Sequence, residues 1–322
     1  MAEAESTSST QANHQQRPLR IGILGFGALG QYLATRIIHE GEIISPGDRP
    51  LILSFVWARD PSKGLSTSDL LPPSTARLSD IDAAASLSVD LVVEVCHPEV
   101  VKNSAVRFLE NGSDILIGSP TALADANLEA QLRSLAPLGG VRRVLIPAGA
   151  LWASSDIARL GAAKRIASLS IEMRKHPLSL SGISGEPAQR LAEWLKATSS
   201  DTNTTNSSST CTLYDGPVRA LAIVAPNNVN TMAAAAISVP NLGFDGVRGI
   251  LIADSSLTCH IITTELEGFK DASGECLSVK TIRKAPAPPG AVTSTATLAS
   301  FWASLRIAAN GIDHSTGGII LC

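Results

Sequence analysis

A glycine-rich turn near the N-terminus constrains the fold of this chain more than any other feature. Residues 20–30 read RIGILGFGALG, so an apolar stretch leads through the pattern G-x-G-x-x-G into a helical pattern. In such a strand–turn–helix unit, Gly25 permits the tight turn, Gly27 lets a pyrophosphate approach the backbone, and Gly30 lets the helix pack close to the strand. Free N–H groups at the start of the helix favour phosphate. The pattern predicts a dinucleotide-binding turn; the alternative is a glycine turn with a purely structural role.

The first half of the chain alternates short apolar runs with helical patterns. The predicted strands are residues 20–24, 51–57, 91–95, 114–117 and 143–146. The predicted helices are residues 29–40, 98–111 and 127–136. Continuous β-branched runs separated by helices are typical of a parallel sheet that is covered on both faces. We therefore expect an α/β domain with a Rossmann-type, doubly wound parallel sheet.

The second half of the chain has a different pattern, because strands follow one another with few helices between them. The predicted strands are residues 168–175, 247–254, 260–267 and 276–282. The predicted helices are residues 182–196 and 229–238. This order favours a second, α+β domain with a mainly antiparallel sheet and helices on one face.

The length of 322 residues also favours two domains, since single cores stop growing near this size. We expect a disordered polar tail over 1–17, the Rossmann domain over 18–150 and an α+β substrate or dimerisation domain over 151–288. The tract TSSDTNTTNSSST, residues 198–210, is expected to be a flexible insertion in the second domain. Residues 289–322 are expected to hold a helix that returns to the Rossmann domain.

Composition excludes several classes of function. A net charge of -3 offers no general attraction to nucleic acid or to an anionic membrane, and 4% aromatic residues provide few stacking platforms. No apolar run reaches the roughly 18 residues that span a bilayer, and the N-terminus lacks an apolar signal core. Five scattered cysteines without a CxxC pair indicate reduced thiols. We expect a cytoplasmic protein with a small-molecule substrate and with neither a nucleic-acid nor a membrane partner.

The end of the second predicted strand bears on the choice between NAD and NADP. A carboxylate at this position bonds to the adenosine ribose hydroxyls, whereas an arginine holds a 2′-phosphate. The strand runs into Ala58, Arg59 and Asp60, so the carboxylate is displaced and an arginine stands beside it. This favours NADP slightly, but Arg59 and Asp60 are equally compatible with solvated loop charges. The predicted cofactor is therefore NAD or NADP.

Further sequence blocks, together with the glycine turn, resemble the L-aspartate dehydrogenase family. These blocks are DLVVEVCHP (90–98), GSPTALAD (118–125), IPAGALW (146–152), RK (174–175), APNNVN (225–230) and AD (253–254), which leads to His260. The resemblance covers nearly everything from Leu19 onward except the polar tract. It implies an enzyme that oxidises L-aspartate with NAD or NADP to iminosuccinate, which water converts to oxaloacetate and ammonia.

The same resemblance implies roles for three residues. His260 matches the family's active-site histidine, while Ala150 and Asn228 match its nicotinamide-nucleotide contacts. A histidine with a pKa near neutrality can take a proton from the substrate amine or activate the water that attacks the imine. The alternatives are a surface or hydrogen-bonded core histidine at position 260 and a helix N-cap at Asn228.

An L-aspartate substrate carries two carboxylates, so its site needs cationic partners. Arg174 and Lys175 end a predicted strand and are the candidates, with Asn228 as a further substrate contact and His176 as a weaker choice. The alternative is a pair of solvated charges at a strand end. The pairs Cys96–His97 and Cys259–His260 do not supply four ligands at workable spacing, so no metal is expected.

The candidate cofactor-binding residues follow the glycine turn and the loops at the carboxyl ends of the strands. They are Gly25, Phe26, Gly27, Ala28, Leu29, Gly30, Arg59, Cys96, Ser119, Thr121, Ala150 and Asn228. Two rival functions share this domain plan. One is a reductase of an imine or β-carbonyl compound, similar to homoserine dehydrogenase or dihydrodipicolinate reductase; the other is a non-catalytic NADP-binding sensor. His260, Asn228 and Arg174 together favour an enzyme, and a homodimer is expected through the second sheet.

Overall fold

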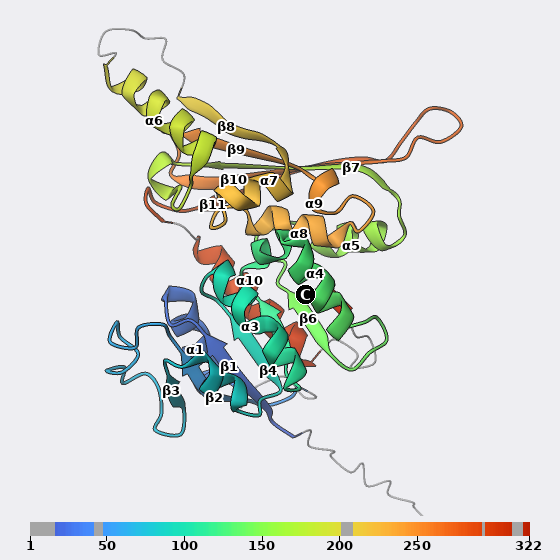
Figure 1. The fold of residues 1–322 in the computed structure, drawn as a ribbon. Coiled ribbons are helices and arrows are strands. Elements are labelled where there is room, and N and C mark those ends of the chain that lie inside the picture. Colours follow the sequence, from blue (N-terminus) through green and yellow to red (C-terminus); the bar gives the residue numbers. More distant parts are fainter. Residues whose placement is uncertain (1–16, 42–47, 201–208, 292–293, 311–317) are drawn as a thin grey trace, which may run out of the picture.

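The computed structural model describes residues 17–41, 48–200, 209–291, 294–310 and 318–322. The chain builds two sheets, one near the N-terminus and one in the second half, with helices between them (Figure 1). Residues 1–16 of the predicted tail and 201–208 of the predicted insertion lie outside the described residues. No helix in the described part of the chain is long and apolar enough to cross a membrane.

The first sheet has seven parallel strands in the order β12-β6-β5-β4-β1-β2-β3. Their bounds are β1 (Leu19–Leu24), β2 (Leu51–Trp57), β3 (Ala76–Leu78), β4 (Leu91–Glu94), β5 (Asp114–Ile117), β6 (Arg143–Ile146) and β12 (Gly318–Leu321). Strand order reverses between β1 and β4, and in such sheets the ligand binds at the carboxyl ends of the strands beside the reversal. The predicted Rossmann-type sheet is confirmed.

Helices cover both faces of this sheet. They are α1 (Ala28–Glu40), α2 (Ile81–Ser86), α3 (Pro98–Glu110), the short 3-10 helix η1 (Pro120–Ala124), α4 (Ala126–Leu135) and α10 (Thr295–Asn310). Because neighbouring strand residues point to opposite faces, Ile21 and Ile23 pack in one apolar cluster with α1 and α10, and Leu24 packs in another with α3. Phe301 and Leu305 bring α10 against α1 in the first cluster.

The second sheet has five strands in the order β11-β10-β7-β9-β8. Its strands are β7 (Ile166–Lys175), β8 (Thr210–Pro217), β9 (Arg248–Asp254), β10 (Cys259–Gly268) and β11 (Ser278–Pro286). The β7–β9 pair is parallel and the other three pairs are antiparallel, which confirms the mainly antiparallel sheet. The accompanying helices are α5 (Ser154–Ala162), η2 (Pro177–Ser179), α6 (Gly185–Ser200), α7 (Val218–Val224), α8 (Asn230–Ser238) and α9 (Gly243–Gly246).

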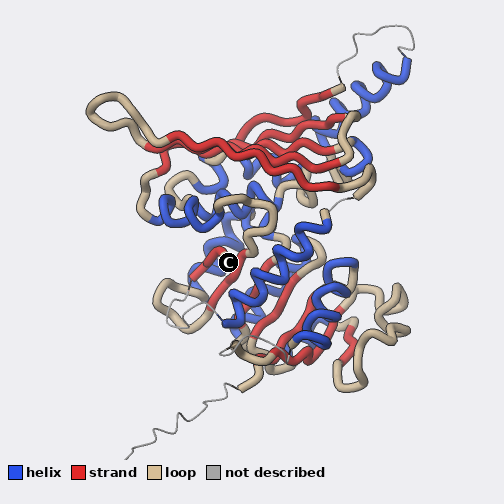
Figure 2. Tube along the Cα trace, turned by 180° about the vertical axis from the view of Figure 1, so that it is seen from behind, coloured by secondary structure: helices blue, strands red, loops and turns tan. Residues whose placement is uncertain are grey.

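Helix α8 joins the two halves of the molecule. It reads NTMAAAAIS, and every residue after Asn230 is buried. A helix that is apolar on all sides needs a surrounding core, and α8 contacts η1 and β12 on one side and β7 on the other. Figure 1 shows α8 between the two sheets, and the view from behind in Figure 2 shows helices filling the space between them. One apolar cluster therefore runs through both domains, and the division into 18–150, 151–288 and 289–322 stays a prediction.

Candidate functional site

A groove of about 910 Å³ lies at the carboxyl ends of β1, β2 and β4. Its glycine turn is shaped for the close approach of a ligand. Gly25 has a φ of +114°, and a Cβ on Gly30 would lie 2.1 Å from the Gly25 carbonyl oxygen, so these two glycines shape the turn itself. A Cβ on Gly27, in contrast, would meet nothing within 4 Å, and Gly27 lines the groove. A side chain there would fill the space that a pyrophosphate needs, and no side chain among the described residues caps the start of α1.

The groove brings together most of the predicted cofactor contacts. Those that line it are Gly25, Phe26, Gly27, Leu29, Arg59, Cys96 and Ser119. Ala28 and Gly30 belong to the first turn of α1 without lining the groove, and Thr121 is buried, with its hydroxyl bonded to Asn230. The turn after β2 and the turn after β4 thus face the same space, as expected for parallel strands that end at one edge.

Glu94, at the end of β4, ties two walls of this groove together and was not among the predicted site residues. Its carboxylate accepts hydrogen bonds from the Cys96 N–H at 2.7 Å, the Ser119 N–H at 2.9 Å and the Ser119 hydroxyl at 3.1 Å. The side chain is fully buried, and burial raises the pKa of its carboxyl above the usual range. The only sequence indication was an acidic residue inside an apolar run.

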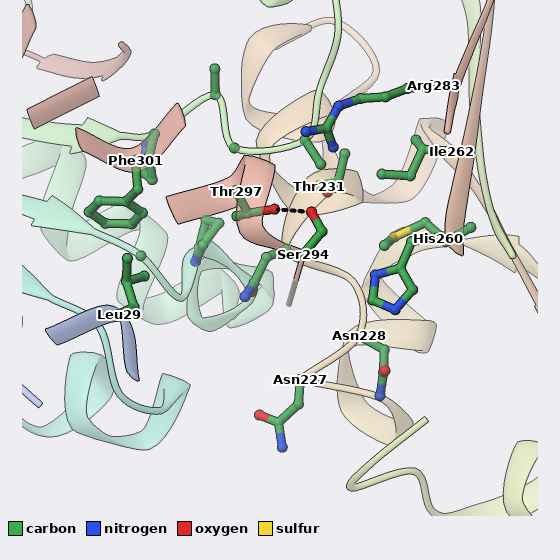
Figure 3. A pocket seen from close by; sticks show the side chains of 18 of the residues that line it. Leu29, Asn227, Asn228, Thr231, His260, Ile262, Arg283, Ser294, Thr297 and Phe301 are labelled. Carbon is green, nitrogen blue, oxygen red and sulfur yellow. Dashed lines mark hydrogen bonds between the residues drawn. The ribbon is translucent and has the colours of Figure 1, made fainter. Parts of the chain in front are cut away.

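A cavity of about 150 Å³ opens beside the groove (Figure 3). The two spaces share Leu29, Gly118, Asn227 and Asn230 in their walls, so they lie side by side. The second sheet forms one side of the cavity. The loop after β6 and the start of α10 form another side. The remaining residues of the cavity wall are Pro120, Pro147, Ala148, Gly149, Ala150, Met173, Lys175, Asn228, Thr231, His260, Ile262, Arg283, Ser294, Thr297 and Phe301.

Strand register decides which side chains of the second sheet reach this cavity. Met173 pairs with Ile262 on β10, which in turn pairs with Arg283 on β11, so these three residues share one face. Lys175 and His260 lie on the same face as their strand neighbours two residues away. Arg174 falls on the opposite face, where its guanidinium lies 3.2 Å from Glu172 and 3.8 Å from Asp254.

Arg174 therefore does not line the cavity, and its contact with substrate stays a prediction that this arrangement does not support. Arg283 takes the place of the second cation. It was missed because the predicted strand ended at residue 282, directly before Arg283, whereas β11 continues to Pro286. Among the residues that the structure describes, the Arg283 guanidinium makes no hydrogen bond or ion pair, and partial burial lowers its pKa. His176 caps η2, accepting from the Leu178 N–H at 3.2 Å, and does not line the cavity.

Lys175 and Asn228 form a buried polar pair in the cavity wall. The Lys175 ammonium donates to the Asn228 side-chain oxygen at 3.3 Å, and the Asn228 amide donates to the Ser181 carbonyl at 2.7 Å. Burial lowers the pKa of Lys175 to about 8, so the side chain remains mostly cationic at neutral pH. No carboxylate lines this cavity in the described part of the chain, so the lysine charge is available to an anionic ligand.

His260 is held at the start of β10 next to Asn228 (Figure 3). Its Nε2 atom lies 3.1 Å from the Ala291 carbonyl oxygen, an acceptor that selects the tautomer with the proton on Nε2. Nδ1 then keeps a free lone pair. Burial, reinforced by the charge of Lys175, lowers the pKa of His260 to about 4. The imidazole is therefore neutral at physiological pH and able to accept a proton.

No group of three metal-ligating His, Cys, Asp or Glu side chains gathers anywhere within the described ranges. The arrangement instead consists of a dinucleotide groove, a small cavity with two cations, and a neutral imidazole at the boundary of the two domains. Ser294 and Thr297, whose hydroxyls lie 3.1 Å apart, add polar groups from the start of α10. Such a set can bind a small anionic molecule beside a nucleotide and move a proton from it.

Comparison with known proteins agrees with this arrangement. Residues 156–304 match the family model "Aspartate dehydrogenase, C-terminal", and residues 25–146 match "Homoserine dehydrogenase, NAD binding domain". An aspartate dehydrogenase domain-containing protein of Xenopus tropicalis is 39% identical over 293 residues, which cover 90% of this chain and 95% of the relative. An L-aspartate dehydrogenase of Methanosarcina barkeri is 28% identical over 256 residues, or 78% and 84% of the two chains.

A solved structure shows the same fold. The crystal structure of aspartate dehydrogenase from Thermotoga maritima superposes with a TM-score of 0.58, at 19% identity, over 92% of this chain and 98% of that one. The cofactor of the first domain is thus NAD or NADP, as the glycine turn predicts.

Proposed function

The chain belongs to the aspartate dehydrogenase family, and on that premise we propose that it oxidises L-aspartate with NAD or NADP. The observation that carries the proposal is the pairing of Lys175 and Arg283 in one small cavity that lies beside the nucleotide groove. Two cations without a carboxylate between them suit a short dicarboxylate better than a neutral substrate. Proteins of similar sequence that are named L-aspartate dehydrogenase support the same substrate.

Each cation has a separate role in this proposal. Lys175 is buried and fixed by Asn228, which suits a point contact with one carboxylate. Arg283 offers a planar guanidinium from the edge strand β11 and suits a bidentate contact with the other carboxylate. Anchoring both ends of the substrate fixes its Cα and orients it toward the groove, which is the entropic contribution that binding makes to catalysis.

His260 is the proposed base. With its Nε2–H bonded to Ala291, the imidazole presents Nδ1 as the acceptor for the proton that leaves the substrate amine. The groove around Gly25 and Gly27 would hold NAD or NADP, which would supply the hydride acceptor for the substrate Cα. The products of this step are iminosuccinate, the reduced nucleotide and a proton; water then adds to the imine carbon, and ammonia leaves to give oxaloacetate. The same imidazole can assist that water.

The first test follows reduced-nucleotide absorbance during L-aspartate oxidation, with NAD and NADP in parallel, for the wild-type protein and His260→Ala. We expect turnover in the wild type and a loss of kcat on the order of 10²-fold or more in the variant, the usual contribution of a general base. Nucleotide affinity should be unchanged, because His260 does not line the groove. Tight nucleotide binding without turnover of aspartate, or of oxaloacetate plus ammonia, would instead favour a non-catalytic sensor or another substrate.

We also propose that the protein is a homodimer formed through the face of the second sheet that is turned away from the Rossmann domain. Helices α7 and α8 pack on the inner face, whereas Ile282 on the outer face is 59% exposed. The outer face also carries the Lys280–Glu265 ion pair at 2.6 Å, so it is mixed rather than purely apolar. Light scattering of the purified protein measures the oligomeric state directly.

A cytoplasmic location stays a prediction.

A further inference from the structure

The groove has a charged end, formed by the turn after β2. Trp57 ends this strand, and its carbonyl oxygen accepts a hydrogen bond from the Gly25 N–H at 2.8 Å. The residues that follow are therefore fixed directly beside the glycine turn. Ala58, Arg59, Asp60 and Lys63 all line the groove. In dinucleotide-binding sheets, the end of the second strand is where the adenosine ribose lies.

The carboxylate of this turn is already engaged by its neighbours. One Asp60 oxygen accepts from the Ser62 hydroxyl at 2.5 Å and from the Ser62 N–H at 3.2 Å. The other oxygen lies 3.6 Å from the Lys63 ammonium. Position 58, directly after the strand, holds an alanine, so no carboxylate stands where ribose hydroxyls are usually bound.

The cations of the turn, in contrast, are available. Arg59 is exposed and forms no hydrogen bond or ion pair with any residue in the described part of the chain. The Lys63 side chain is 83% exposed, and within the described ranges its one ionic contact is Asp60. Asp60 is also the only carboxylate among the described residues of the groove wall, so this end carries a net positive charge. A phosphate monoester, with about −1.5 to −2 charges near pH 7, would offset it.

We propose that Arg59 and Lys63 bind the 2′-phosphate of NADP, and that the protein prefers NADP to NAD. The guanidinium supplies a planar pair of donors to phosphate oxygens, and the ammonium supplies a mobile second charge. The inference refines the cofactor of the proposed oxidoreductase. It does not depend on aspartate as the substrate, because nucleotide binding is measurable without turnover.

The test measures binding of adenosine 2′,5′-bisphosphate and of 5′-AMP to the full-length protein by calorimetry. These probes differ only in the 2′-phosphate. We expect the wild type to bind the bisphosphate on the order of 10-fold more tightly, which corresponds to one or two charge-assisted hydrogen bonds in partly exposed surroundings. Arg59→Ala should remove most of this preference without changing the affinity for 5′-AMP, and Lys63→Ala should remove a smaller part. The preference should also fall as ionic strength rises.

Two matched variants separate this proposal from its rivals. Arg159→Ala removes an exposed arginine of α5, remote from the groove, and should leave both affinities unchanged. Asp60→Asn should leave 5′-AMP binding unchanged, because Asp60 is engaged within its own turn. Equal wild-type affinities, an Arg59→Ala effect that is the same for both probes, or a loss of 5′-AMP binding in Asp60→Asn would each overturn the proposal. Failure of aspartate turnover would not affect these affinities.

Discussion

The nucleotide groove and the small cavity beside it share a wall, yet they are built in different ways. The groove is formed largely by backbone: a glycine turn, a free helix start and two loops tied together by Glu94. The cavity is formed by side chains that come from three strands, a buried loop and the start of α10. The two cations of the groove, Arg59 and Lys63, are exposed, whereas the two basic side chains of the cavity, Lys175 and His260, are buried and have lowered pKa values.

This difference explains why the two sites depend on sequence in different ways. A backbone site requires particular glycines at fixed spacing, and a local motif contains that information. A side-chain site requires residues far apart in the chain to share one face of a sheet, and only strand register brings them together. Substitutions that add atoms should therefore disturb the groove most. Substitutions that remove charged groups should disturb the cavity most.

The largest effect is expected from Gly30→Val, which adds atoms to the turn. A Cβ at this position would lie 2.1 Å from the Gly25 carbonyl, and neither backbone can move freely. We expect a loss of roughly 3 kcal/mol in the free energy of unfolding, measured by urea denaturation, as for severe overpacking. Gly27→Ala is the matched control: it should keep wild-type stability but weaken nucleotide binding, because its methyl group enters the groove. Equal stabilities of the two variants would contradict the assignment.

The next largest effect is expected on the KM for aspartate, when two arginines of the second sheet are substituted in turn. Arg283→Met should raise the KM for aspartate on the order of 30-fold, because it removes about 2 kcal/mol of charged hydrogen bonding. Arg174→Met removes an identical group from the opposite face and should change KM less than about threefold, as is usual for a partly exposed ion pair. Steady-state kinetics with saturating nucleotide measures both. The reverse ranking would place the substrate on the other face of the sheet.

A smaller effect is expected on the pH dependence of inhibition by succinate. Succinate, a dicarboxylate without an amine, reports on the cations of the cavity alone. Burial lowers the pKa of Lys175 to about 8, so its charge is present below this pH and lost above it. The inhibition constant of succinate should therefore increase about tenfold between pH 7 and pH 9, since each pH unit above the pKa lowers the cationic fraction nearly tenfold. Lys175→Arg should abolish this increase, and an unchanged profile would show that another group titrates.

Much of the first domain was predictable from sequence, because its elements have local signatures. The predicted ranges 51–57, 114–117 and 143–146 coincide with β2, β5 and β6. Strand β12 was not predicted, since a four-residue apolar run at the chain end becomes a strand only by pairing with β6, far earlier in the sequence. The same is true of β3, whose three residues pair with the end of β2.

The site was predictable in part. Lys175, Asn228 and His260 were candidates before the structure, and the structure brings them together in one cavity. Arg174 was chosen with Lys175 because they are neighbours in sequence, but alternation along a strand sends neighbours to opposite faces. Glu94 was not predicted because its role depends on N–H groups of a loop that lies 25 residues further along the chain.

The alanine-rich helix α8 has a consequence for the thermodynamics of the whole chain. Domains that touch through small polar surfaces unfold separately and rotate about a hinge. Here the small side chains of α8 let both sheets pack on the same buried helix, within one apolar cluster. Losing either sheet would expose α8, so neither half is stable without the other. We expect one cooperative heat-absorption peak, and access to the cavity through movement of loops rather than through rotation of whole domains.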